Sequence, residues 1–233
     1  MHSFHVPELH AGTVVLPEGE AHHAVNVLRL KTGTTVLLLN GRGATAEATI
    51  AQADKKACTA LCSAIAQHPP ERLCRIHIAC APTKNIDRFE WMLEKCTEIG
   101  VDRITPLITQ RTERTHLRHD RSLNVLVSAM KQSERAWLPL LDGPTTIDQI
   151  LKEPLPAQRF FGWCEGERGP LVSAFRSNED VVMLIGPEGD FTPEEAGTLR
   201  NAGFVATSLG NARLRTETAA IMACATFNMR QAT

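Results

Sequence analysis

The chain has 233 residues, of which 43% are hydrophobic and 22% charged, and its formal net charge is −1. This composition is that of a soluble globular protein with a proper core, and the net charge by itself indicates no nucleic-acid partner. The first residues lack the basic and apolar regions of a signal peptide, and no apolar run approaches the length of a membrane span. We therefore expect a protein without membrane association.

The cysteines give no sign of a metal centre or a disulfide framework. There are seven, an odd number, and they are scattered mostly through apolar segments. Cys58 and Cys62 are too far apart for a CxxC pair, and the adjacent His22 and His23 would point in different directions on a helix, with no third ligand at a suitable spacing. We expect a reducing cytoplasm and no metal.

Residues 1 to about 67 are predicted to be mainly β-structure around one helix, Glu18–Leu30. Asn40-Gly41 favours a hairpin between two of the strands. The segment Gly41–Ala46 matches a dinucleotide-binding pattern, but an alternating strand follows it in place of a helix, so we interpret it as part of the hairpin. A small barrel of this kind is a common RNA-binding platform, although fold alone proves no function. The predicted strands are residues 13–16, 34–39, 44–53 and 57–66.

Two prolines in His68–Arg72 mark the predicted boundary between a first domain, residues 1–68, and a second, residues 72–233. Beyond them strands alternate with helices, which argues for a mostly parallel sheet covered on both faces. The predicted strands are residues 75–81, 103–108, 137–141, 159–164, 181–185 and 204–209. The predicted helices are residues 87–99, 122–134, 147–151 and 171–175, with two more that begin near Thr192 and Thr216.

The stretch from Val181 to Met229 has the most informative pattern. The apolar run 181–185 ends in Gly186-Pro187-Glu188-Gly189-Asp190, whose glycines leave backbone N–H groups open to a ligand. A capping box, Thr192-Pro193-Glu194-Glu195, then starts a helix. The strand at 204–209 ends in a second loop, Gly210-Asn211, and Thr216 is expected to cap the final helix. Ordinary turns are the alternative, but ligands of open α/β sheets bind beyond such strand ends.

Positive charge concentrates in one part of the chain. Residues 72–135 contain 12 Lys and Arg against 8 Asp and Glu, whereas residues 136–233 contain 8 against 12. The excess centres on Gln110–Arg121, with four arginines and two histidines. Such a loop can grip RNA phosphates or can simply be solvated, and both interpretations stay open.

Other candidates are less specific. Arg29 follows an apolar stripe and is either a surface cation or an RNA contact. Gln132–Arg135 closes a helix and contacts either the sheet or a substrate. No Ser-His-Asp or Cys-His arrangement occurs in a familiar context, and no Gly-Lys-Ser/Thr of a phosphate-binding loop is present.

Taken together, five segments resemble the RsmE group of SPOUT-class methyltransferases, named for 16S rRNA (uracil-1498-N3)-methyltransferase. Each segment is weak alone, but they occur in the family's order over nearly the whole chain. They are His23–Leu30, Lys84–Val101, Lys131–Arg135, Leu184–Gly189, and Leu209-Gly210 with Leu214–Ala219.

The resemblance implies a small N-terminal PUA-like β-barrel followed by a SPOUT α/β domain with a C-terminal trefoil knot. It implies a homodimer that binds S-adenosyl-L-methionine and acts on 16S rRNA in the 30S subunit. The chain departs from the family at Asp190, where Gly is usual, and at Arg213, where an aliphatic residue is usual. Asp190 puts a carboxylate close to a loop implied to hold the cofactor, and we expect this carboxylate to alter cofactor affinity. The implied cofactor-binding residues are Leu184, Ile185, Gly186, Pro187, Glu188, Gly189, Leu209, Gly210, Leu214, Thr216 and Thr218.

Uracil N3 carries a proton at neutral pH, so an enzyme must favour the anionic base and align it with the methyl group. We expect Arg215 to stabilise that anion and Glu217 to orient Arg215 or take part in proton removal; alternatively, both only brace the loops. A SPOUT enzyme with another RNA target and a non-catalytic ribosome assembly factor are the rival functions. The candidate RNA-phosphate contacts are Arg29, Arg111, Arg114, Arg118 and Arg135.

Overall fold

The computed structural model describes residues 1–54 and 57–231, and the chain divides into two compact units. Unit 1 comprises residues 1–71 and 127–138, and unit 2 comprises residues 72–126 and 139–233. The first break, after Glu71, falls within the proline-rich segment. The sequence-based division, in contrast, kept every residue after 72 in the second domain, whereas the contacts assign residues 127–138 to unit 1.

Unit 1 is built on a six-stranded sheet in the order β1-β3-β4-β5-β2, with β6 paired to β4. The β1–β3 pair is parallel, and the other pairs are antiparallel. β1 was not expected, since its sequence does not alternate. The strands are β1 (His2–His5), β2 (Gly12–Val15), β3 (Thr35–Leu39), β4 (Ala44–Ala53), β5 (Cys58–Cys62) and β6 (Ala66–Gln67).

The hairpin predicted at Asn40-Gly41 joins β3 to β4. The Asn40 side-chain oxygen accepts hydrogen bonds from the backbone N–H groups of Arg42 (2.7 Å) and Ala44 (2.9 Å). Gly41 has φ 72°, a conformation that few other residues adopt without strain. These interactions confirm the hairpin interpretation over the dinucleotide-binding one.

The predicted helix 18–30 is shorter than expected and changes type along its length. It begins as α1 (Glu18–His22) and continues as a π-helical turn, His23–Val27. The N–H of Leu28 donates to the carbonyl of His23 (2.9 Å), five residues back. Arg29, with φ 52°, then ends the helix in the left-handed region.

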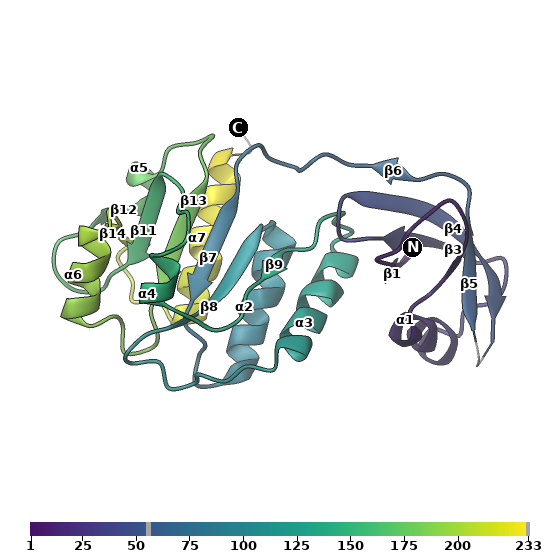
Figure 1. Cartoon of the computed structure of the whole chain (residues 1–233), viewed down its shortest axis with the longest axis horizontal. Helices are drawn as coiled ribbons and strands as arrows, with labels where there is room; N and C mark the ends of the chain where they lie inside the picture. The colour runs from purple at the N-terminus through teal and green to yellow at the C-terminus, as the bar shows by residue number, and fades with distance from the viewer. Residues whose placement is uncertain (55–56, 232–233) are drawn as a thin grey trace. The chain divides into compact units, whose positions relative to one another are not determined.

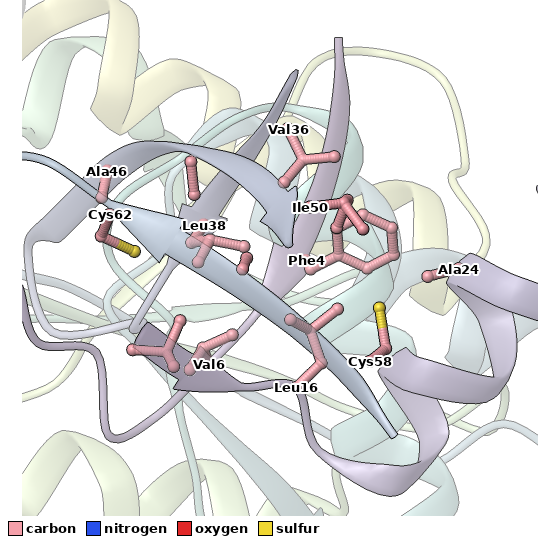
Figure 2. Close-up of a cluster of buried hydrophobic side chains, with 13 residues drawn as sticks. Phe4, Val6, Leu16, Ala24, Val36, Leu38, Ala46, Ile50, Cys58 and Cys62 are labelled. Atoms are coloured by element: carbon pink, nitrogen blue, oxygen red, sulfur yellow. The ribbon is translucent and has the colours of Figure 1, made fainter. Parts of the chain in front are cut away.

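The core of unit 1 lies where the bent sheet meets this helix (Figure 2). Alternation along β4 buries every second side chain, from Ala44 to Ile50, as a strand with one covered face requires. Phe4 of the unexpected β1 is fully buried there, and Ala24 contributes from the π-helical turn. This burial fixes the N-terminal strand and the helix to the same sheet.

Unit 2 has an eight-stranded sheet in the order β10-β8-β7-β13-β11-β14-β12, with β9 paired to β8. Its pairings are parallel, as the alternation of strands and helices predicted. The strands are β7 (Ile76–Cys80), β8 (Arg103–Ile108), β9 (Leu140–Leu141), β10 (Thr145–Thr146), β11 (Gln158–Gly162), β12 (Gly169–Pro170), β13 (Val181–Ile185) and β14 (Val205–Ser208). The helices are α2 (Ile86–Ile99), α3 (His119–Gln132), α4 (Ile147–Ile150), α5 (Leu171–Ala174), α6 (Pro193–Asn201) and α7 (Thr216–Gln231); α3 ends in unit 1.

Helices cover both faces of the unit 2 sheet. α2 and α7 pack together, and α7 also contacts the central strands β7 and β13 (Figure 1). The opposite face buries Val182 and Leu184 of β13 against α4 and α6. Because each face of β13 meets a helical layer, all five of its residues are buried, which explains its continuous apolar sequence.

Two local predictions were wrong. The expected strand 137–141 is reduced to β9, Leu140–Leu141. Thr216 does not cap α7 but is its first residue, and its hydroxyl donates to the carbonyl of Gly186 (3.1 Å). Within the described ranges, no helix is both long and apolar enough to cross a membrane.

Candidate functional site

A pocket of about 560 Å³ lies at the carboxyl ends of β11, β13 and β14 in unit 2. In a parallel sheet these ends meet along one edge, where the loops that follow the strands surround a common space. The pocket is lined by Gly162, Trp163, Cys164, Glu165, Arg168, Ile185, Gly186, Pro187, Glu188, Gly189, Asp190, Thr207, Ser208, Leu209, Gly210, Asn211, Ala212, Arg213, Leu214, Arg215, Thr216 and Ala219.

The loop after β13 is a tight turn that tolerates little change. The N–H of Asp190 donates to the carbonyl of Pro187 (2.9 Å). A Cβ atom on Gly186 would lie 3.2 Å from both the ring and the backbone nitrogen of Phe191. Phe191 is itself buried edge-on against Phe161, with ring centroids 5.8 Å apart. A side chain at position 186 would therefore require Phe191, which is buried, to shift by a few tenths of an ångström.

Neighbouring segments hold this loop through its polar groups. Arg111 donates from Nη1 to the carbonyls of Gly189 (2.7 Å) and Phe191 (3.2 Å). The Glu188 carboxylate accepts the backbone N–H of Lys84 (3.1 Å). The predicted capping box of α6 is present, with reciprocal bonds between Thr192 and Glu195. The loop is thus anchored on both of its flanks, as a preorganised binding site requires.

Asp190 joins the loop after β13 to the segment after β11. Its Oδ2 atom accepts the N–H of Cys164 (2.9 Å), and Oδ1 accepts the N–H of Phe191 (2.8 Å). Its backbone has φ 61°, a left-handed conformation that Asp adopts more readily than most residues. Burial raises the pKa of the Cys164 thiol, and the charge of Asp190 adds to this. Cys164 is therefore a neutral thiol at the pocket wall.

The loop after β14 leads into α7. The Arg215 carbonyl accepts the N–H of Ala219 (2.8 Å), which places Arg215 at the N-cap of the helix. Its side chain is exposed, lines the pocket and has no ion pair within residues 1–54 and 57–231. Glu217 is only 5% exposed, lies outside the lining and, in the described part of the chain, makes no ion pair with Arg215. Burial raises the pKa of the Cys80 thiol, and the charge of Glu217 adds to this shift.

The pocket offers charges of both signs as well as backbone groups. Glu165, Glu188 and Asp190 supply carboxylates, and three arginines supply cations: Arg168, Arg213 and Arg215. Such a lining suits a ligand with separate positive and negative groups, and the volume is in the range of small-molecule sites. Among the described residues, no cluster of three or more side chains could hold a metal ion.

Most residues predicted for the cofactor site lie together in this pocket. Two do not, since Leu184 and Thr218 are absent from its lining. The sequence-based prediction missed the segment Gly162–Arg168, which forms a third wall after β11. The expected strand at 159–164 was the available signal, because its carboxyl end had to reach the same edge of the sheet as β13. The predicted residues found in the lining are Ile185, Gly186, Pro187, Glu188, Gly189, Leu209, Gly210, Leu214 and Thr216.

The five arginines proposed as phosphate contacts have different environments. Arg111 and Arg114 are occupied by backbone carbonyls, since Arg114 donates to Lys84 O (3.1 Å) while Arg111 holds the Gly186 loop. Arg135 pairs with Glu71 within unit 1. Arg29 and Arg118 are exposed. Charge in the sequence therefore did not distinguish surface cations from arginines that brace loops.

Comparison with known families covers both units. A model described as an RNA methyltransferase domain matches residues 69–228, and one described as an RNA methyltransferase PUA domain matches residues 16–61. A relative from Rickettsia conorii, named ribosomal RNA small subunit methyltransferase E, is 30% identical over 207 residues, which cover 88% of this chain and 84% of the relative. The chain belongs to the ribosomal RNA small subunit methyltransferase E family.

Solved structures agree with this membership. A ribosomal RNA small subunit methyltransferase E from Neisseria gonorrhoeae, bound to S-adenosyl methionine, is 28% identical and has a TM-score of 0.88, with 99% of this chain and 98% of that chain covered. A structure from Porphyromonas gingivalis, described as a probable rRNA-methyltransferase, is 37% identical with a TM-score of 0.91 over 100% of this chain and 99% of that chain. Unit 1 is accordingly a PUA-like domain, as the family resemblance implied.

Proposed function

We propose that the chain transfers a methyl group from S-adenosyl-L-methionine to N3 of uridine 1498 in 16S rRNA of the 30S subunit. It is an RNA methyltransferase of the E family, and S-adenosyl-L-methionine is its methyl donor. The observation that carries the proposal is the pocket at three strand ends, in a fold shared over almost its full length with a relative that is bound to this cofactor.

The pocket residues fit this donor. Bound S-adenosyl-L-methionine supplies a methyl group already activated on a positively charged sulfur. Backbone groups of Ile185–Gly189 and Leu209–Leu214 would hold its adenosine, because these loops present N–H and C=O groups with few side chains in the way. A Cβ atom on Gly210 would meet nothing within 4 Å, so this wall is open towards a ligand. The lining carboxylates and arginines complement the donor's positive and negative groups.

Arg215 is the proposed catalytic residue. Loss of the N3 proton spreads negative charge over O2 and O4 of uracil, and a guanidinium beside these atoms would favour that anion. Arg215 suits this role because it lines the pocket at the start of α7 with an exposed side chain. Uracil N3 lies on the pairing edge of the base, so the target nucleotide must be unpaired or swung out of its helix.

Glu217 is proposed as a second functional residue, either as a proton acceptor or as a residue that positions Arg215 through the first turn of α7. Its burial at 5% exposure and its place outside the lining favour the positioning role. Leu184 and Thr218 would support the cofactor loops from behind the lining. Arg29 and Arg118 are the proposed phosphate contacts, since both side chains are exposed.

Three finer features of the proposal come from the family resemblance. We propose that the loops after β13 and β14 belong to a trefoil knot of the SPOUT type, that two copies form a homodimer, and that the protein works in the cytoplasm. The knot is supported by the Thr216–Gly186 bond, which ties the start of α7 to the loop after β13. The cytoplasmic location is supported by seven free cysteines.

The decisive experiment measures transfer of labelled methyl from S-adenosyl-L-methionine to 30S subunits that lack the modification, with nucleoside analysis of the product. We expect 3-methyluridine at a single 16S position. Label in another nucleoside, or only in another RNA, would favour a SPOUT enzyme with a different target. Failure to bind S-adenosyl-L-methionine at all would favour the assembly-factor alternative.

Variants of the proposed catalytic residues test their roles. Arg215→Ala should abolish methyl transfer but leave cofactor binding measurable, whereas Arg176→Ala, at an exposed arginine paired with Glu179, should behave as the wild type. Full activity of Arg215→Ala would refute its role. Glu217→Gln keeps the shape of the side chain, so a large loss in rate would favour proton transfer and a small one the positioning role.

A further inference from the structure

Unit 1 contains a second pocket, of about 390 Å³, that the proposed methylation chemistry does not use. It brings together two family-like segments that lie far apart in the sequence, His23–Leu30 and Lys131–Arg135. This is possible because residues 127–138 belong to unit 1. The pocket is lined by Met1, His2, Ser3, His23, Leu28, Lys131, Gln132 and Glu134.

The walls of this pocket are held in place. Lys131 Nζ lies 2.6 Å from Glu20 Oε1, and the two side chains are only 19% and 12% exposed. This half-buried pair fastens the end of α3 to α1 and neutralises the positive charge of Lys131. The His23 ring is held edge-on to Phe4, with centroids 6.4 Å apart and an interplanar angle of 65°.

Both helices that border the pocket end in a left-handed residue that is not glycine. Arg29 has φ 52° and Glu134 has φ 53°. The next residue in the chain closes each helix end with a backbone hydrogen bond. The N–H of Leu30 donates to the carbonyl of Ala24 (2.9 Å), and the N–H of Arg135 donates to the carbonyl of Met130 (3.0 Å). Glycine is the usual residue at such a position because it avoids strain. Backbone strain at a residue with a long polar side chain is found most often at functional sites, which makes these two side chains candidates for ligand contacts.

The polar groups of the pocket suit a neutral heteroaromatic ring better than a phosphate. Gln132 is exposed, and its amide, which both donates and accepts, has no hydrogen-bond partner among residues 1–54 and 57–231. Glu134 adds an acceptor, and a carboxylate would repel a phosphate. Histidine rings are surfaces on which unpaired bases stack. Arg29 is outside the lining, but it is exposed and follows the lining residue Leu28 in the chain, which makes its guanidinium available to an adjoining phosphate.

We propose that this pocket binds one unpaired nucleobase of the RNA substrate, a nucleotide other than the one methylated. Gln132 and Glu134 hydrogen-bond the edge of the base, His23 stacks on it, and Arg29 contacts a neighbouring phosphate. The inference rests on the proposed function, because it assumes an RNA substrate. It assigns to the Lys131–Arg135 segment a role in RNA recognition, separate from the cofactor site in unit 2.

Steady-state kinetics with unmodified 30S subunits test the pocket. Gln132→Ala and His23→Ala should each raise KM for 30S about tenfold, in line with the loss of one base contact, and leave kcat and the Kd for S-adenosyl-L-methionine unchanged. Gln67→Ala, at an exposed glutamine of the same unit, is the matched control and should keep the wild-type KM. Wild-type KM in both pocket variants would overturn the proposal.

Arg29→Gly separates recognition from folding. Glycine relieves the left-handed strain, so the variant should unfold at an equal or higher urea concentration while its KM for 30S rises severalfold. If Arg29 has only a structural role, the Arg29→Gly variant should be stabilised without any change in its KM for 30S. That result would remove Arg29 from the proposal.

Crosslinking distinguishes failure of the pocket from failure of the proposed function. Unmodified 30S subunits with 4-thiouridine in their RNA would be irradiated with the full-length protein, and the crosslinked peptides identified by mass spectrometry. Crosslinks in residues 23–29 or 131–135 support the pocket even if no methyl is transferred. Crosslinks confined to other segments overturn it even if methylation proceeds, and absence of any 30S binding overturns both proposals.

Discussion

Asp190 offers a sharp test of how the proposed cofactor pocket is held together. The family resemblance led us to expect glycine at this position, yet here a carboxylate accepts the N–H groups of Cys164 and Phe191 at 2.9 and 2.8 Å. Hydrogen bonds to a charged group contribute about 1.5–3 kcal/mol each. The side chain is half-buried, so we discount this for solvent screening to about 1–2 kcal/mol for each bond.

Three substitutions at position 190 lose different parts of this arrangement. Asp190→Asn tolerates φ 61° but has one acceptor oxygen for two N–H groups, so it loses one bond. Asp190→Gly loses both bonds but relieves the backbone strain, whereas Asp190→Ala loses both and keeps the strain. If the bonds hold the binding-competent loops, the Kd for S-adenosyl-L-methionine should rise least for Asn, more for Gly and most for Ala. One lost bond corresponds to roughly a 5- to 30-fold change.

Isothermal titration calorimetry measures these affinities, and urea unfolding of each variant reports its stability. Asn178→Gly is the control, because Asn178 is exposed and has φ 65° but lies outside the pocket lining. It should show the benefit of strain relief without any change in cofactor affinity. An Asp190→Gly variant that binds as tightly as the wild type would refute the idea that the Asp190 carboxylate organises the pocket.

Two further predictions concern stability. Burial lowers the pKa of His77 from 6.5 to about 4, so between these pH values the unfolded chain binds a proton that the folded chain does not. The free energy of unfolding should therefore fall by roughly 3 kcal/mol as the pH drops from 7 to 4. The substitution His77→Gln should remove that part of the pH dependence. Gly43 and Gly33 have φ 92° and 91°, but a Cβ atom on Gly43 would lie 2.6 Å from Trp137 whereas one on Gly33 would meet nothing within 4 Å. The free energy of unfolding of Gly43→Ala, measured by urea titration, should therefore be about 1–3 kcal/mol lower than that of Gly33→Ala. Equal values for the two variants would show that backbone strain alone determines the loss of stability.

Features with a strong local cause were predictable from the sequence. The hairpin depends on the Asn40 side chain and on Gly41, and the start of α6 depends on the Thr192–Glu195 capping box, all of them neighbours in the chain. The five apolar residues of β13 are buried on both faces, which is what a short continuous apolar run indicates. In the hairpin and the capping box the partners of a residue lie within a few positions of it, and in β13 the apolar run by itself carries the signal.

Features decided by distant partners were not predictable. Thr216 has the residue type of a helix cap, yet its hydroxyl bonds to Gly186, thirty residues earlier. Local propensity was overruled there by a contact that the sequence does not encode nearby.

The arginines show the same limit for the functional site. Four arginines between Gln110 and Arg121 suggested an RNA-binding loop, but a guanidinium can also donate to backbone carbonyls within the protein, and composition does not identify which partner it has. The carbonyls of Gly189 and Phe191 accept hydrogen bonds from Arg111, so this arginine braces the loop after β13, which we propose holds the cofactor. Gln132, by contrast, ends a helix assigned from the sequence to the second domain, and only the return of residues 127–138 to unit 1 places it beside His23. Under our proposals, RNA recognition by this chain therefore depends less on the density of positive charge than on which polar groups remain without partners after folding.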